Sequence, residues 1–354
     1  MENDGDQQPL LSSAGRTDTA AGAGEGATVG REPTSFSATT AEDEMAGDSR
    51  SKTKDKMQSK ASSVAAVPLR YAAPLGGVKG SLLRSLPVVF VLSLLSVVVG
   101  VYVSFHIAPL LQQHETDRAA FNRGIWEFAV FVFLLALFML CFALSVFVRP
   151  GQPTELGEEA LETHNAAETK SGGGLRVCKW CGVWKPDRTH HCRVCRGCVL
   201  RMDHHCPWLA NCVGWGNHKY FMLLLFYGAL TCLFVAATML ESVIRVVNEP
   251  KADFVELFLL LLGSSLDILI FAVIFLFGLF HLYLLAKGMT TIEFCEKRFK
   301  RAHDQPPSNM WNLGFWRNFN EVFGYNPLLW FVPVDNRHGD GRHFPLSVPS
   351  AHVD

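Results

Sequence analysis

The sequence lacks a marked excess of charge of either sign. Its 32 Lys and Arg residues nearly balance its 33 Asp and Glu residues, which leaves a formal net charge of −1 over 354 residues. A protein that binds nucleic acid through the phosphate backbone needs a basic surface. We therefore expect no nucleic acid among the partners of this chain.

Charged residues are also missing from three long apolar stretches, 86–105, 128–148 and 220–240, and a fourth stretch, 257–285, contains only Asp267. About 20 apolar residues, at 1.5 Å rise each, suffice to cross a bilayer. A soluble helix of this length would carry a polar face. The sequence therefore predicts an all-α polytopic membrane protein with four transmembrane helices, and we expect Asp267 near the lumenal interface rather than in a transport path.

The remaining sequence separates these spans into recognisable segments. No apolar stretch with a cleavage site precedes residue 86, so we expect the first span to act as its own insertion signal. We expect no internal repeat. The predicted boundaries are a disordered cytosolic tail (1–78), transmembrane helices (86–108 and 126–148), a cysteine-rich module (176–218), transmembrane helices (220–243 and 260–286), a cytosolic juxtamembrane region (287–335) and a flexible tail (336–354).

The distribution of basic residues predicts the orientation in the membrane. Ten Lys and Arg residues lie from Arg149 to Lys219, against two between the first and second spans and two between the third and fourth. Because cytosolic connections carry the excess of Lys and Arg, the segment between spans two and three is expected on the cytosolic side. Both termini are then cytosolic as well.

Cysteine is concentrated in that same segment. Seven of the ten cysteines lie between residues 178 and 212, on the side of the membrane where thiols stay reduced. Metal binding or catalysis is therefore the better expectation than disulfides. The other three, Cys141, Cys232 and Cys295, are interpreted as small apolar residues or acylation sites.

The chemistry-bearing residues follow the pattern Cys178-x2-Cys181-x9-His191-Cys192-x2-Cys195-x2-Cys198-x4-Asp203-His204-His205-Cys206-x5-Cys212. Cys-x2-Cys pairs with nearby histidines are typical of tetrahedral Zn²⁺ sites, and metal must supply much of the folding energy of so small a module. Two closed sites need eight ligands, whereas seven cysteines and four histidines are present. Three groups are therefore surplus.

The surplus leaves two interpretations open. If one cysteine is free, a nearby histidine could take its proton and an aspartate could orient that histidine, as nucleophilic catalysis requires. Alternatively, the module is a zinc scaffold without turnover. Spacing alone does not decide which ligands share a metal, since sequential and interleaved pairings are both possible.

These motifs resemble the DHHC protein acyltransferases, the S-palmitoyltransferases. The resemblance covers residues 80–335. It rests on Lys185–Cys192, Asp203–Trp208, Asn211–Asn217, the Thr290-Thr291-Ile292-Glu293 element and Asn318–Gly324.

The resemblance implies an interleaved ligand pattern. One structural Zn²⁺ would be held by Cys178, Cys181, His191 and Cys198. The other would be held by Cys192, Cys195, His205 and Cys212.

It also implies the catalytic roles. Cys206 would be the nucleophile that carries the acyl group, His204 its general base and Asp203 the partner that orients His204. Thr291 would contact Asp203. Trp208 and Asn318 are further motif positions.

Five residues would form a basic face that binds the acyl-CoA phosphates: Lys185, Arg188, His190, Arg193 and Arg176. The alternative is that these charged side chains are only solvated at the cytosolic surface. In this family, chain-length selectivity is thought to depend on side-chain bulk where the first and third spans meet. Thr231 lies eleven residues after Tyr220, about 16 Å along a helix, and the resemblance places it at that end of the acyl cavity.

The implied function is transfer of a long-chain acyl group from palmitoyl-CoA, or other long-chain acyl-CoA, to cytosolic cysteines of membrane-associated proteins. The expected location is an integral multi-pass position in the lipid bilayer of the endomembrane system, namely Golgi, endolysosomal or plasma membrane. A catalytically silent zinc-binding membrane scaffold is the alternative.

Overall fold

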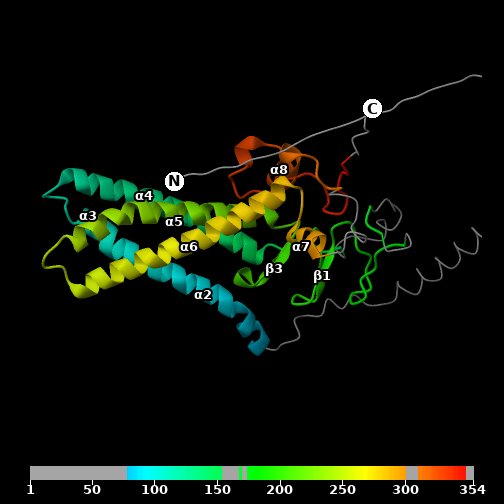
Figure 1. Ribbon diagram of the computed structural model, residues 1–354, viewed down its shortest axis with the longest axis horizontal. Coiled ribbons are helices and arrows are strands. Elements are labelled where there is room, and N and C mark those ends of the chain that lie inside the picture. Colours follow the sequence, from blue (N-terminus) through cyan, green and yellow to red (C-terminus); the bar gives the residue numbers. More distant parts are fainter. Residues whose placement is uncertain (1–77, 154–166, 170–173, 300–309, 348–354) are drawn as a thin grey trace, which may run out of the picture. The chain divides into compact units, whose positions relative to one another are not determined.

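Four long helices dominate the computed structural model, which describes residues 78–153, 167–169, 174–299 and 310–347. They are α2 (Val78–Tyr102), α4 (Arg118–Phe147), α5 (His218–Val247) and α6 (Phe254–Ala286). The helices run side by side as a bundle (Figure 1). The tail expected to be disordered is residues 1–78. Residues 1–77 of it lie outside the described residues.

Each of these helices is long and apolar enough to cross a membrane. The candidate spans have mean hydropathies between 2.2 and 2.9, and they cover Ser85–Leu111, Arg118–Phe147, His218–Val247 and Phe254–Ala286. The cysteine-rich segment follows the second span and precedes the third. The expected fold class of four membrane helices with an intervening cysteine-rich module is therefore confirmed.

The first span changes helix type near its end. A π-helical segment (Val103–Ile107) leads into the short helix α3 (Ala108–Leu111), and Asp117 then caps α4 by accepting from the backbone N–H groups of Ala119 and Ala120. His106 of the π-helical segment is buried. Its Nδ1 lies 2.8 Å from Ser242 Oγ and its Nε2 lies 2.8 Å from Glu127 Oε2, so one polar side chain joins three helices.

Close helix contact in the bundle is visible at one glycine. A Cβ added at Gly263 of α6 would lie 2.6 Å from Val101 Cγ1 of α2, so a larger residue there would push these two helices apart. One turn further along α6, Asp267 is 1% exposed and lies close to the middle of this 33-residue helix. The position of Asp267 relative to the lumenal interface stays a prediction.

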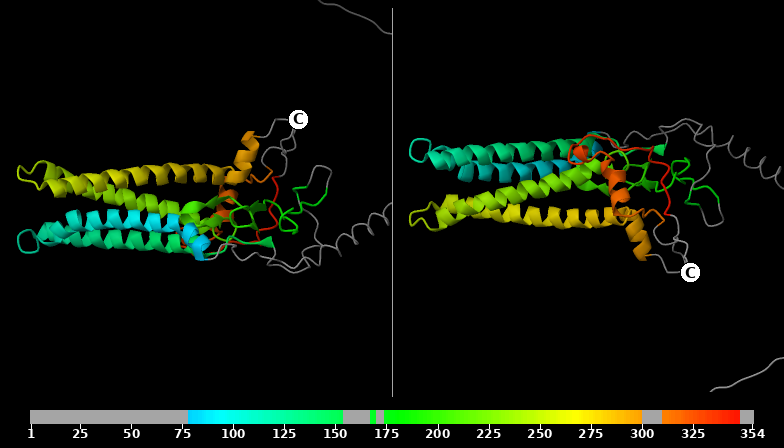
Figure 2. Two further views of the ribbon diagram at one scale, coloured as in Figure 1. Left: turned by 90° about the horizontal axis from the view of Figure 1, so that it is seen from below. Right: turned by 90° about the horizontal axis from the view of Figure 1, so that it is seen from above.

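The cysteine-rich module differs from an all-helical fold in its local structure. It contains two antiparallel hairpins, β1 (His190–Cys192) with β2 (Gly197–Val199), and β3 (His204–Cys206) with β4 (Asn211–Val213). The reason is local, because Cys-x2-Cys turns and tight hairpins bring ligands together over very short strands. Figure 2 shows the module at one end of the bundle, with the α3–α4 and α5–α6 connections at the other end.

Two asparagines of the module donate hydrogen bonds to the backbone carbonyl groups at the end of α4. The last carbonyls of a helix have no partner within the helix. Here Asn211 Nδ2 donates to the carbonyl oxygens of Ser145, Val146 and Val148 at 3.0–3.2 Å. Asn217 Nδ2 donates to Cys212 O at 2.9 Å within the module, and to Ser145 O and Val148 O at 3.4 and 3.5 Å at the same helix end.

A buried ion pair joins the module to the segment after α6. Arg188 is 1% exposed, and its guanidinium donates to both carboxylate oxygens of Glu293 in α7 (Thr291–Phe299), at 2.7 and 2.8 Å. It also donates to Gly288 O at 2.9 Å. Bidentate pairing of this kind fixes orientation as well as distance.

The C-terminal segment packs on α5 and on the module. Helix α8 (Phe315–Phe323) and a 3₁₀ turn (Pro327–Leu329) precede it. The buried Lys219 ammonium donates to Leu329 O, Val334 O and Asn336 Oδ1 at 2.7–2.9 Å.

Phe344 extends this packing toward the end of the described chain. Its ring lies edge-on to Trp215 and Trp311 and beneath the guanidinium groups of Arg188 and Arg201. Within the part of the expected flexible tail that the structure describes, residues 336–347, Phe344 and the buried Arg342 are therefore packed against the rest of the chain, whereas His338 and Leu346 are exposed. The aromatic and cationic contacts of Phe344, distant in sequence, are the physical reason.

Replacing Arg188 by Ala should destabilise the protein by about 3–5 kcal/mol, because Glu293 is left buried and unpaired. Thermal unfolding of the purified chain in detergent measures the effect. The exposed Arg193→Ala is the matched control and should unfold like wild type. Equal unfolding temperatures for both variants would contradict a stabilising role for the ion pair.

Candidate active site and metal centres

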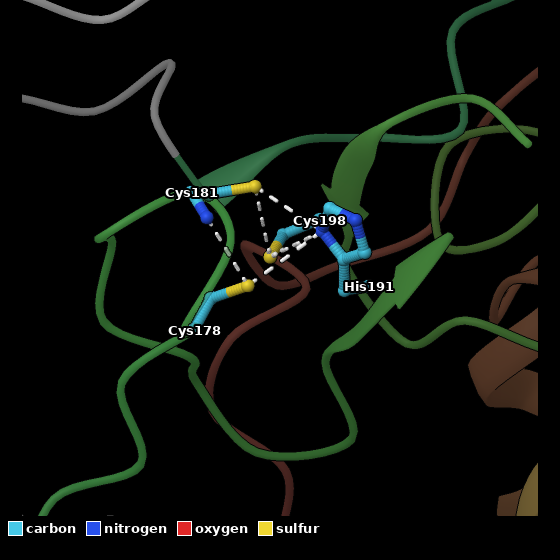
Figure 3. A group of neighbouring side chains, drawn as sticks. All are labelled: Cys178, Cys181, His191 and Cys198. Atoms are coloured by element: carbon cyan, nitrogen blue, oxygen red, sulfur yellow. Dashed lines mark hydrogen bonds between the residues drawn. The ribbon is translucent and has the colours of Figure 1, made fainter. Parts of the chain in front are cut away.

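The first Cys/His cluster comprises Cys178, Cys181, His191 and Cys198. Their side chains converge on one point (Figure 3). His191 Nδ1 lies 3.6, 3.2 and 3.9 Å from the Sγ atoms of Cys178, Cys181 and Cys198, respectively. The hairpin register pairs His191 with Cys198, which supplies two of the four groups from adjacent strands.

The second cluster comprises Cys192, Cys195, His205 and Cys212. His205 Nδ1 lies 3.4 Å from Cys195 Sγ and 3.6 Å from Cys212 Sγ. The hairpin register again pairs the histidine with the last cysteine. Each cluster could hold a metal ion, and the ligand sets are interleaved along the chain.

The two clusters are an internal repeat of short period. Each member of the second cluster lies 14 residues after its counterpart in the first cluster. Cys192 follows Cys178 at this interval, and Cys212 follows Cys198. The backbone repeats as well, since Arg196 and Ala210, separated by the same interval, both have positive φ angles, 56° and 49°. The expectation of no internal repeat is therefore wrong. The short period and the overlap of the two units conceal it.

The repeat accounts for the free cysteine. One further step of the same interval leads from Cys192 to Cys206, where a third Cys-x2-Cys pair would begin, but the position for its second cysteine is occupied by Leu209. Cys206 is accordingly absent from both clusters. Its thiol is the one among the seven of the module that no metal group claims.

An aspartate and a histidine precede this thiol. Asp203 is 1% exposed, and its Oδ2 lies 2.6 Å from His204 Nδ1. Thr291 of α7 donates to both carboxylate oxygens, from its N–H at 3.0 Å and from its hydroxyl at 2.7 Å. Alternate strand residues point to the same face, so His204 and Cys206 share one face of β3.

The environment shifts the pKa values of this pair in opposite directions. Burial would raise the pKa of Asp203, but the hydrogen bond from His204 and the charges of nearby histidines hold it well below its usual value. Burial would lower the pKa of His204, but the hydrogen bond and charge of Asp203, with a contribution from Cys206, raise it to about 9. The pair thus favours an ionised carboxylate beside a strongly basic imidazole.

Cys206 faces the apolar end of the bundle. It is 6% exposed and belongs to a cluster of buried side chains that includes Phe142 of α4 and Phe221 of α5. Val88 and Val91 of α2 pack against the same cluster. The thiol therefore lies where polar module and apolar helices meet.

The expected basic face is only partly formed. Arg188 does not belong to it, because its guanidinium is buried and is bound to Glu293. Arg176 donates to Thr189 O at 2.9 Å and pairs with Glu168. Sequence reveals the charges but not the acidic partners that engage them.

The other three residues of that face differ from one another. Burial, followed by the charge of Arg176, lowers the pKa of His190 to about 4, so this ring is neutral near pH 7. Lys185 is half-buried and Arg193 is exposed. Lys185 and Arg193 are thus the remaining candidates for anion binding.

The remaining predicted positions lie in three places. Trp208 is 53% exposed, and its ring centroid lies 6.1 Å from that of Phe90 on α2. Thr231 is buried in α5 and donates to Tyr227 O. Asn318 is buried in α8, where its amide donates to Ala286 O at the end of α6.

One residue beside the site was missed by the sequence analysis. His281 of α6 is 2% exposed, and its Nδ1 lies 3.9 Å from Asp203 Oδ2. The available signal was a polar residue inside an apolar stretch, which by default suggests function.

Comparison with known proteins places these groups in a family. Residues 172–298 match the family model described as DHHC palmitoyltransferase. The chain is 40% identical over 184 residues to "Palmitoyltransferase ZDHHC15" of Rattus norvegicus, covering 50% of this chain and 52% of the relative. It is 40% identical over 181 residues to "Palmitoyltransferase ZDHHC2" of Mus musculus, covering 50% and 48%.

A fish relative gives a similar match. The chain is 42% identical over 191 residues to "Palmitoyltransferase ZDHHC15A" of Danio rerio, covering 53% of this chain and 56% of the relative. The aligned regions span about half the length of these curated relatives. Residues 172–298, which contain both Cys/His clusters and the strand from His204 to Cys206, are therefore the part of the chain that matches the DHHC palmitoyltransferase family model.

Proposed function

We propose that this chain is a protein S-palmitoyltransferase. It takes a long-chain acyl group from acyl-CoA onto Cys206 and passes it to a cysteine of a membrane-associated protein. The observation that carries the proposal is the position of Cys206, which lies outside both metal clusters, on the same strand face as His204, at the apolar end of the bundle.

The reaction has two balanced steps. The Cys206 sulfur attacks the thioester carbonyl carbon, so that a new carbon–sulfur bond forms and the bond to the CoA sulfur breaks. The thiol proton passes to His204 Nε2 and then to the departing CoA thiolate. In the second step a substrate thiol repeats the attack, and its proton returns through His204 to Cys206.

The Asp203–His204 contact supports this role for His204. The hydrogen bond to Nδ1 leaves Nε2 turned toward the reaction, and Nε2 has no hydrogen-bond partner among the described residues. The raised pKa of His204, about 9, favours an imidazolium that retains the proton given up by the Cys206 thiol, beside the resulting thiolate. Asp203 stabilises the imidazolium that results.

Zn²⁺ is the metal that fits the two clusters. Three sulfurs and one imidazole nitrogen form each set, which suits a closed structural site. Tetrahedral zinc separates two sulfurs by about 3.8 Å and sulfur from nitrogen by about 3.5 Å, and the corresponding separations in the clusters are 3.4–3.8 and 3.2–3.9 Å. Zinc here would supply folding energy rather than chemistry.

The acyl donor is proposed to be palmitoyl-CoA or another long-chain acyl-CoA. Burying the chain among the helices contributes roughly 0.8 kcal/mol per CH₂, so the chain itself provides most of the binding energy. The phosphates would be bound by Lys185 and Arg193. Both residues retain solvent access.

The membrane arrangement follows from charge. The ten basic residues between spans two and three support a cytosolic module, cytosolic termini and a cytosolic active site. Cytosolic cysteines of membrane-associated proteins are then the accessible acceptors. Golgi, endolysosomal and plasma membranes are the proposed compartments.

Replacing Cys206 by Ser should abolish a hydroxylamine-sensitive fatty-acid label while leaving two zinc ions per chain. Labelling with a fatty acyl-CoA probe and metal analysis of the same sample measure both properties. Cys295→Ser, an exposed thiol on α7, is the control and should keep the label. A Cys206 variant with about one zinc would identify Cys206 as a ligand and contradict the assignment.

The two adjacent histidines should behave differently. His205→Ala should lose zinc and expression because a metal site loses its fourth ligand, whereas His204→Ala should retain zinc and acylate itself roughly 10²–10⁴-fold more slowly. Metal content and the rate of self-acylation separate the two roles. Equal zinc loss in both variants would refute this division.

Replacing Thr231 by Tyr should shift preference toward shorter acyl chains, because overfilling the pocket costs about 1–3 kcal/mol. With Thr, eighteen-carbon chains should react at rates near those of sixteen-carbon chains. Competition between mixed acyl-CoAs measures the profile, and Leu230→Tyr, on an exposed position of α5, should leave it unchanged. An identical profile for wild type and Thr231→Tyr would remove Thr231 from the cavity.

The alternative for closing that cavity is a bulky residue of the first span, Phe90 or Leu94. Phe90 is half exposed and its ring lies near Trp208 of the module. Leu94 is half-buried, so a residue of the first span and Thr231 both remain candidates for closing the cavity.

A further inference from the structure

His281 lies directly behind the Asp203–His204 pair. Its Nδ1 is 3.9 Å from Asp203 Oδ2, the same oxygen that contacts His204 Nδ1 and the Thr291 hydroxyl. The two imidazole rings lie with centroids 5.5 Å apart and planes inclined by 38°. His281 therefore contacts the site from the membrane helix, whereas Thr291 contacts it from α7.

Two phenylalanines frame both imidazole rings. Phe277 and Phe221 lie edge-on to His281, with ring centroids 4.5 and 4.9 Å away. The same two side chains lie edge-on to His204 at 6.2 and 5.2 Å. His204, His281 and these phenylalanines thus form one packed group, in which a shift of either imidazole ring displaces the other.

Packing alone does not explain a histidine at this position. An apolar residue of similar size would fill the space, and burying a polar ring without partners costs free energy. Nε2 of His281 has no hydrogen-bond partner among the described residues. Nδ1 is directed to the buried carboxylate, so with its proton on Nδ1 the ring places an N–H dipole toward the negative charge of Asp203.

A third metal ion is a weaker explanation of this group. Asp203, His204 and His281 could be ligands by proximity. However, two ligands of one tetrahedral zinc lie about 3.3 Å apart for nitrogen and oxygen, whereas Asp203 Oδ2 and His204 Nδ1 are 2.6 Å apart. That separation is a charge-assisted hydrogen bond.

We propose that His281 is a positioning residue for the acyl-transfer reaction. Its ring holds His204 in the orientation that turns Nε2 toward Cys206, and its Nδ1–H side stabilises the ionised Asp203 carboxylate. The inference rests on the proposed function of Cys206 and His204. It assigns to α6 a direct part in arranging the site, which connects the acyl-binding bundle with the proton-transfer pair.

The test compares variants that separate ring packing from polarity. His281→Phe keeps an aromatic ring but removes the nitrogen atoms, and His281→Asn places an amide N–H near the position of Nδ1. With purified full-length chain in detergent, His281→Phe should lower kcat for self-acylation roughly ten- to hundredfold, because misplaced groups lose near-attack geometry. KM for palmitoyl-CoA should change less than twofold, and His281→Asn should recover most of the lost kcat.

Matched controls keep the test decisive. Leu282→Phe, on the exposed side of α6, should leave kcat unchanged, and every variant is assayed for two zinc ions. If His281→Phe does not fold, His281→Asn and His281→Leu provide the same comparison between a polar and an apolar side chain. Wild-type kcat in the variant without nitrogen atoms, or an Asn variant no faster than its apolar counterpart, would overturn the proposal.

A second readout does not depend on acyl transfer. The alkylation rate of Cys206 by iodoacetamide, resolved by peptide mass spectrometry, reports how well the pair activates the thiol. It should fall in His281→Phe and recover in His281→Asn. Absence of acyl transfer in wild type would refute the proposed function, whereas equal alkylation rates across the variants would refute the role of His281 alone.

Discussion

The buried carboxylate of Asp203 is the interaction on which the arrangement of the site depends. It receives hydrogen bonds from its neighbour His204 and from Thr291, and it lies within 3.9 Å of His281. These contacts come from the module, from α7 and from α6. A charge that cannot reach water must be compensated by the protein, so forming this group requires three separate parts of the chain to be docked.

The membrane helices were the most predictable part of the structure. Charge-free apolar stretches indicate a span whatever packs around it, and the helices lie where hydropathy placed them. The Cys and His residues of the module were equally clear as a set. Their division into two ligand sets was not clear from the sequence. Which residues share a metal depends on the register of the two hairpins and on the overlap of the two sets, and not on the spacing between neighbouring cysteines.

Two errors of the sequence analysis share one cause. Arg188 was assigned to a phosphate-binding face, yet Glu293, far along the chain, is its partner. Phe344 was expected in a flexible tail, and its ring packs on two tryptophans. In each case a contact distant along the chain decides the environment, and local pattern carries no information on it.

The interleaving of the two metal clusters has a consequence for biosynthesis. During translation the first cluster cannot be completed until Cys198 has left the ribosome, and by then Cys192 and Cys195 of the second cluster are already exposed. Five thiols and His191 then compete for the first metal ion, and only one grouping of four matches the native hairpin. The order in which the chain emerges therefore creates a choice between correct and crossed metal sites, and rapid closure of the β1–β2 hairpin, which pairs His191 with Cys198, favours the correct one.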